Sequence, residues 1–136
     1  MTWAVLDTNV LVSGLGWPRS LPGRIVNWAV AGRFMLVTSE PLLDELRRVL
    51  AYPRLAGAIG EPGELVRLVS EVAVVVEPDR EVTVIEHDPA DNRVLEAAVA
   101  AQADCIVTGD ADLLEIVSFE GVRIVSPREF IAGESR

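Results

Sequence analysis

Two aspartates follow apolar runs at positions where a parallel sheet would bring their carboxylates together. Asp7 comes directly after the run 3–6, and Asp110 comes two residues after the run 105–108. If these runs are neighbouring strands, both carboxylates lie at the carboxyl edge of the sheet, in the crevice where open α/β sheets bind ligands. For each residue alone a structural role has equal weight, because aspartate often caps the turn or helix that follows it. The matching positions of the pair favour a functional site.

A third acid, Glu45, borders the apolar stripe of a predicted helix. The stripe is formed, at helical spacing, by Leu42, Leu46, Val49 and Leu50. Two other acids of this segment, Glu40 and Asp44, fall outside the stripe, and we interpret them as surface charges. A glutamate beside the core is harder to explain by solvation, so Glu45 is the candidate ligand.

The segment around Asp88 and Pro89 supplies the fourth acid. An aspartate followed by proline is typical of a helix start, which makes Asp88 the expected N-cap and gives it a mainly structural role. Asp91 shares a helical face with Val94, Leu95 and Ala98 and should point toward the sheet. The alternative for Asp91 is a reciprocal cap, in which its carboxylate bonds the backbone at Asp88, although aspartate is short for that role.

A cation would relieve the repulsion among four core-facing carboxylates, since neighbouring like charges raise one another's pKa. The chain has one cysteine, Cys105, and one histidine, His87, which excludes thiolate metal sites and most histidine triads. Hard oxygen ligands favour Mg²⁺ or Mn²⁺, and such sites typically handle phosphates. Asp112 is a supporting ligand in this hypothesis, or it only stabilises the first turn of the following helix. The chemistry predicted is phosphodiester hydrolysis.

Alternating apolar runs and helical patterns predict one α/β domain over residues 1–136, with a buried parallel sheet. The expected strands are 3–6, 34–37, 72–76, 105–108 and 122–125. The expected helices are 22–31, 41–51, 64–71, 89–102, 111–116 and 127–131, and the expected loops are 14–23 and 57–63. In this arrangement the first strand is central, and the helices carry Glu45 and Asp91 to its carboxyl end.

The composition limits the possible partners. Half of the 136 residues are hydrophobic, yet no run is long enough to cross a membrane, so we expect a soluble, cytoplasmic protein. The net charge of -9 argues against attraction of nucleic acid by the whole surface. That argument weakens where several carboxylates hold divalent cations, because the local field then changes sign.

The order of the acidic segments resembles the PIN-domain family, in particular its bacterial toxin-like (VapC-type) branch. The similar segments are 6–11, 39–50, 88–98 and 108–114, spread over nearly the whole chain. The resemblance implies an α/β/α sandwich around a five-stranded parallel sheet, and endonucleolytic cleavage of RNA by metal-activated water with Mg²⁺ or Mn²⁺. It gives the catalytic acids as Asp7, Glu45, Asp91 and Asp110.

The same resemblance implies supporting residues and partners. Asn9, Thr108 and Asp112 would help to position the acids or the water, although Asn9 and Thr108 are equally explained as hydrogen-bonding residues of turns. A small antitoxin protein that blocks the site is implied, and a homodimer is frequent in the family. The arginines nearest to the acids in sequence are Arg47, Arg48 and Arg93, which are candidates for substrate binding, with ordinary solvated helix surface as the alternative.

Two other functions fit parts of the pattern. A phospho-acceptor or phosphatase-like domain also places acids at strand ends, but such domains rely on a lysine and this chain has none. Those phosphatases also carry a second aspartate where this chain has Asn9. A non-catalytic module of the same fold that binds RNA or a protein remains open, because the acids show capacity for catalysis rather than turnover.

Overall fold

The centre of the molecule is a six-stranded sheet with the order β3-β2-β1-β4-β6-β5. We describe residues 1–55 and 57–134 from a computed structural model. The strands are β1 (Trp3–Leu6), β2 (Met35–Ser39), β3 (Val74–Val76), β4 (Cys105–Val107), β5 (Ser118–Phe119) and β6 (Val122–Val125). Five strands are parallel, and the expected α/β sandwich is confirmed. The expected strand count was one too low, because β5 adds a two-residue antiparallel strand beside β6.

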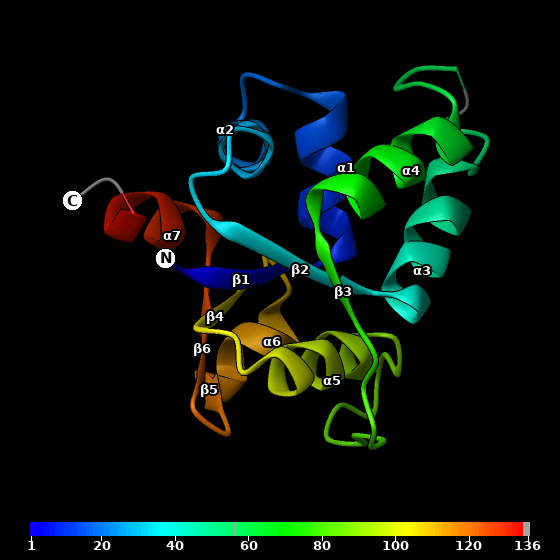
Figure 1. Cartoon of the computed structure of the whole chain (residues 1–136). Coiled ribbons are helices and arrows are strands. Elements are labelled where there is room, and N and C mark those ends of the chain that lie inside the picture. The colour runs from blue at the N-terminus through cyan, green and yellow to red at the C-terminus, as the bar shows by residue number, and fades with distance from the viewer. Residues whose placement is uncertain (56, 135–136) are drawn as a thin grey trace.

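Seven helices in the described residues cover the sheet. They are α1 (Thr8–Gly16), α2 (Leu21–Val30), α3 (Glu40–Leu50), α4 (Pro62–Val72), α5 (Asp91–Ala101), α6 (Ala111–Ile116) and α7 (Pro127–Glu134). Helices α1, α2 and α4 lie on one face of the sheet, whereas α5 and α6 lie on the other (Figure 1). Helix α3 starts directly at the end of β2, at the carboxyl edge of the sheet. No helix in the part of the chain that the structure describes is long and apolar enough to cross a membrane.

Alternating side chains of the central strands build a core on each face. Ala4 and Leu6 of β1 enter the cluster under α1, α2 and α4, whereas Val5 enters the cluster under α5. The residues of β4 divide in the same way, since Val107 joins the first cluster and Ile106 the second. A strand that is apolar on both faces must be central, so the sequence of β1 fixes it in the middle of the sheet.

Helix α1 corrects the expected loop over residues 14–23, since the helix that begins at Thr8 continues through Gly16. Its valine-rich and glycine-containing sequence has weak intrinsic helix propensity, so packing decides its structure. At Gly14, an added Cβ would lie 2.4 Å from Val26 Cγ2 and 2.7 Å from the carbonyl oxygen of Pro22. Glycine therefore allows α1 and α2 to pack in direct contact, and α1 carries the backbone away from Asp7.

Candidate active site

The carboxyl ends of β1 and β4 bring Asp7 and Asp110 to one crevice. The two strands pair in parallel with Leu6 opposite Val107, and the next residues leave the sheet in different directions, Asp7 into α1 and Thr108 toward α6. This is the topological switch point of the sheet, because β2 follows on one side of β1 and β4 lies on the other. The strand order confirms that the strands carrying these two acids are neighbours.

Thr108 links the two aspartates through hydrogen bonds. Its hydroxyl donates to Asp7 Oδ2, and its Oγ1 accepts a hydrogen bond of 2.9 Å from the backbone N–H of Asp110. Asp7 is only 4% exposed, and its Oδ1 accepts a 2.8 Å hydrogen bond from the N–H of Val10. Burial raises the pKa of Asp7, the bonds from Thr108 and Val10 oppose that rise, and the charge of Asp110 adds to it.

Both aspartates also cap helices, so the structural and functional roles coexist. Asp7 is the N-cap of α1, and Asp110 caps α6 through a 3.1 Å bond from the N–H of Leu113 to Oδ1. In each case only Oδ1 receives the helix N–H. Capping thus fixes the orientation of each carboxylate toward the crevice, which is what a rigid ligand or catalytic group requires.

Glu45 reaches the same crevice from α3. The helix buries Leu42 and Leu46, Asp44 on the outer face is exposed, and Glu45 is half-buried between the two, as expected. Burial raises the pKa of Glu45, the neighbouring Arg48 opposes this rise, and the charges of Asp88 and Asp7 add to it. The hydroxyl of buried Thr8 also donates a hydrogen bond to Glu45.

Asp91 is the most strongly perturbed acid of the crevice. Burial, followed by the charges of Asp110, Asp88 and Asp7, raises the pKa of Asp91 to about 7. Its Oδ2 is buried and has no hydrogen-bond partner among the described residues. A carboxylate of this kind, desolvated and surrounded by other acids, is typical of a functional site rather than of a structural one.

Asp88 was interpreted from sequence as a mainly structural cap, and the structure adds a second role. Its Oδ1 accepts a 3.1 Å bond from the N–H of Ala90, so it caps a turn, whereas α5 begins two residues later than expected, at Asp91. Its charge raises the pKa of both Glu45 and Asp91. Asp88 therefore lies at the rim of the acidic group, and its position before a proline gave no signal of this.

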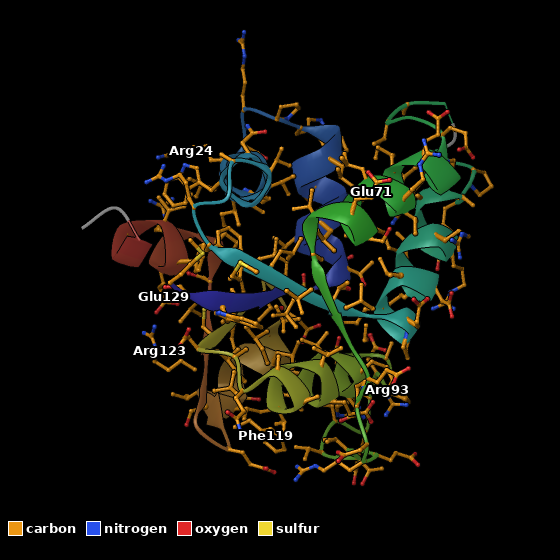
Figure 2. The ribbon with its side chains drawn as sticks, in the orientation of Figure 1. Arg24, Glu71, Arg93, Phe119, Arg123 and Glu129 are labelled. Carbon is orange, nitrogen blue, oxygen red and sulfur yellow. The ribbon has the colours of Figure 1, made fainter. Side chains whose placement is uncertain are left out.

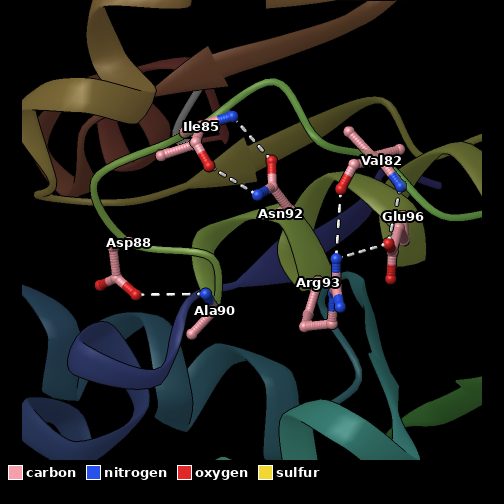
Figure 3. A network of polar contacts seen from close by, with 7 residues as sticks. All are labelled: Val82, Ile85, Asp88, Ala90, Asn92, Arg93 and Glu96. Atoms are coloured by element: carbon pink, nitrogen blue, oxygen red, sulfur yellow. Dashed lines mark hydrogen bonds and ion pairs between the residues drawn. The ribbon is translucent and has the colours of Figure 1, made fainter.

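A buried polar clamp on α5 holds the extended segment that leads to Asp88 (Figure 3). The amide of Asn92 accepts from the N–H of Ile85 and donates to its carbonyl oxygen, both at 2.8 Å. One turn further along, Glu96 accepts a 2.8 Å bond from the N–H of Val82. Arg93 donates to the carbonyl oxygen of Val82 at 3.2 Å and pairs with Glu96 at 2.8 Å. Residues 77–90 form no helix or strand, so these bonds position the segment.

We expect Asn92→Ala to lower the free energy of unfolding by about 2–3 kcal/mol, because it leaves the N–H and carbonyl of Ile85 buried without partners. Asn92 is 3% exposed, so water cannot replace the lost bonds without opening the segment. Urea denaturation followed by circular dichroism measures the change. The matched control is Asn27→Ala on the exposed surface of α2, which should change stability by about 0.5 kcal/mol or less. Equal effects of both substitutions would contradict the role of Asn92 in holding the segment at Ile85.

The other predicted site residues differ in exposure and in their contacts. Asn9 is exposed on α1, and exposed Asp112 lines a separate hollow with Glu86 and His87. Arg47 pairs with Asp44 at 3.4 Å on the outer face of α3. Arg93 differs from its expected role as a substrate-binding residue, because its guanidinium is engaged by Glu96 and Val82. Among these three arginines, Arg48 is the one whose charge acts on a crevice acid.

The crevice supplies ligands of the kind that Mg²⁺ and Mn²⁺ prefer. Its donors are carboxylate and hydroxyl oxygens, and Cys105 is buried in the sheet. A bound cation would give the free Oδ2 of Asp91 a partner and would relieve the mutual repulsion that, together with burial, raises the pKa of Asp91. In the described residues, however, no three carboxylates, imidazoles or thiols stand close enough to form a complete ligand cage. The residues fit a divalent ion in type and charge, and the acids would have to approach one another to hold it.

Comparisons with known proteins agree with this architecture. The sequence profile described as PIN domain matches residues 4–112. An uncharacterized protein of Methanocaldococcus jannaschii is 28% identical over 138 residues, which cover 93% of this chain and 88% of the relative. A chain from the crystal structure of VapBC2 from Rickettsia felis, bound to a DNA fragment from the promoter, superposes with a TM-score of 0.63. That match has 11% sequence identity, covers 92% of this chain and 98% of the other, and shows similarity of fold alone.

Proposed function

Because the chain belongs to the PIN-domain family, we propose that it is a divalent-metal-dependent endoribonuclease that hydrolyses RNA phosphodiester bonds. PIN domains are in general nucleases, and they typically use divalent metal ions. The observation that carries the proposal is the crevice at the switch point, where burial and the charges of Asp110, Asp88 and Asp7 raise the pKa of Asp91 to about 7.

In this proposal each acid has a defined part. The ion, Mg²⁺ or Mn²⁺, would be held by Asp7, Glu45, Asp91 and Asp110. Asp88 would lie at the rim of this site, and Asp112 would be a more distant supporting acid. The bound ion would polarise the phosphoryl oxygen and lower the pKa of the attacking water. Thr108 keeps Asp7 Oδ2 in place, and Thr8 does the same for Glu45. Asp91 Oδ2 is buried without a hydrogen-bond partner among the described residues, so it is free to accept a proton or a cation.

We further propose that the nuclease acts in the cytoplasm as the toxin of a toxin–antitoxin pair. A small antitoxin protein that covers the crevice would control it, and a homodimer is the expected assembly. The structural similarity to a chain of VapBC2 supports this part through fold alone.

A non-catalytic RNA- or protein-binding module of the same fold is the second candidate. The observation in its favour is that the described acids do not form a complete ligand cage. A cleavage assay separates the two, because a binding module would gain thermal stability from Mn²⁺ without cutting any of a varied set of RNAs.

The test of the proposed function is transcriptome-wide mapping of new RNA 5′ ends after brief expression. The wild type should generate new 5′ ends that share a sequence or structural context, whereas Asp110→Asn should generate none. The matched control is Glu115→Gln, which removes an exposed charge from the same helix, α6, and should cleave as the wild type does. Identical 5′ ends in the wild type and Asp110→Asn would overturn the assignment of the crevice.

A further inference from the structure

The charges of this acidic protein are distributed very unevenly along the chain. Residues 8–39 contain three arginines and no aspartate or glutamate, whereas residues 40–136 contain twenty acids and nine arginines. The first segment forms α1, α2 and β2, so the positive charge belongs to one corner of the fold. A protein with a net charge of -9 thus has one segment that carries three positive charges and no acid.

The centre of this surface is an indole between two guanidinium groups. Trp28 projects from α2, with the Arg33 guanidinium carbon 4.1 Å from its ring centroid and that of Arg24 at 5.8 Å. Arg24 projects from α2 to the outside of the molecule (Figure 2). We call Arg24, Trp28 and Arg33 the α2 basic face. Stacking fixes the plane of a guanidinium while its N–H groups stay free for bidentate bonds to phosphate.

The arginines of this face differ from four others in the chain in their charge partners. Arg47, Arg67, Arg80 and Arg93 each pair with a carboxylate. Neither Arg24 nor Arg33 makes an ion pair within the described residues, and both side chains are exposed. Their positive charge is therefore available to an external anion.

We propose that the α2 basic face binds the sugar–phosphate backbone of single-stranded RNA outside the cleavage site. The inference rests on the proposed function and extends it, because it says where the substrate is held. Guanidinium groups held against an indole suit a flexible single strand, since their N–H groups are fixed in direction and bond phosphates without sequence preference. An acidic protein segment would also satisfy the charge, and we favour RNA because the proposed function requires the protein to hold an RNA strand.

The fold places this face within reach of one RNA strand that also enters the crevice. Arg33 immediately precedes Phe34 and β2, whose first residue, Met35, pairs with Trp3 at the amino edge of the sheet. Asp7 lies at the opposite edge, and the four residues of β1 between them span about 13 Å at ~3.3 Å per residue. That span corresponds to a few nucleotides of extended RNA. The basic face thus offsets, at a distance, the repulsion between phosphates and the acidic crevice.

The experiment compares two double substitutions that remove the same charge. Arg24→Gln with Arg33→Gln changes the α2 basic face, and Arg54→Gln with Arg67→Gln changes exposed arginines beyond the end of α3 and on α4. Both pairs are made in an Asp110→Asn background, so that cleavage does not interfere. Fluorescence anisotropy measures binding of a labelled 20-nucleotide single-stranded RNA, and of labelled polyglutamate, from 50 to 200 mM salt.

The first pair should weaken RNA binding about tenfold at low salt and reduce the salt slope by ~1.4, because two phosphate contacts are lost. The second pair should leave both values close to those of the background. Equal losses from both pairs would overturn the α2 basic face as a site, and so would a loss that affects polyglutamate but not RNA. A parallel RNA cleavage assay, in a background that keeps Asp110, separates the two proposals. Cleavage without an effect of Arg24→Gln and Arg33→Gln overturns this inference alone, whereas neither cleavage nor binding overturns both.

Discussion

Asp7→Asn is expected to lower the rate of RNA cleavage at least ~10³-fold, equivalent to ~4 kcal/mol of activation free energy. Asparagine keeps the shape and one carbonyl oxygen, so the bond from the N–H of Val10 can persist. It loses the negative charge that a divalent ion requires, and Thr108 loses its charged acceptor. Single-turnover cleavage of a labelled RNA in Mn²⁺ measures the loss.

The stability of the same variant separates a catalytic role from a structural one. Burial already disfavours the charge on Asp7, so its removal should leave the melting temperature unchanged or higher in the absence of metal. Asp44→Asn, which removes an exposed acid from α3, is the matched control and should retain full activity. Cleavage by Asp7→Asn within tenfold of the wild type would contradict the proposed role of the crevice.

The central part of the fold was predictable because its sequence signals are local and strong. The run 3–6 is apolar and the run 122–125 alternates apolar residues with Arg123, as strands do, and both appear as β1 and β6 with the expected bounds. Residues 111–116 form α6 as predicted, with Asp110 as its cap. Once β1 is central, the carboxyl-end positions of Asp7 and Asp110 follow from the parallel topology.

Helix α1 was missed because its stability comes from packing that a single sequence does not reveal. Val10 and Val12 favour a strand, and Gly14 and Gly16 favour a loop. Only the contact of Gly14 with Pro22 and Val26 explains why glycine is required inside a helix. The role of Thr8 was missed with it, because its contact with Glu45 joins residues 37 positions apart.

The environment of Asp91 illustrates a second limit of sequence reasoning. The helical face correctly directed Asp91 away from solvent, but Asp88 was assigned by the proline that follows it and Arg93 by its nearness to Asp91 in sequence. The structure turns Arg93 toward Glu96 and brings Asp88 close enough to Glu45 and Asp91 to raise both pKa values. Charge partners depend on how the segment 77–90 folds back on α5, and that segment has no periodic pattern.

The repulsion around Asp91 leads to the second large effect, which is that Asp91→Asn should stabilise the metal-free protein while abolishing cleavage. The folded-state pKa of about 7 lies above the ordinary value of 3.8, so between these pH values the folded protein binds a proton that the unfolded chain does not. Stability therefore falls as pH rises from about 4 to about 7. After a discount for solvent screening of this half-exposed group, removal of the charge at pH 8 should add about 1–2 kcal/mol.

Thermal unfolding in EDTA at pH 5.5 and pH 8 tests this sign directly. The wild type should melt at a lower temperature at pH 8 than at pH 5.5, and Asp91→Asn should reduce that difference by raising the value at pH 8, by roughly 3 °C or more. Mn²⁺ should restore the wild type at pH 8 and leave the variant unchanged, because only the wild type gains by neutralising the acid. Glu86→Gln removes an exposed charge shortly before α5 and should melt as the wild type does at both pH values and with Mn²⁺. A variant less stable than the wild type at pH 8 would contradict the repulsion around Asp91, because it would mean that the charge of Asp91 stabilises the folded protein in the absence of metal.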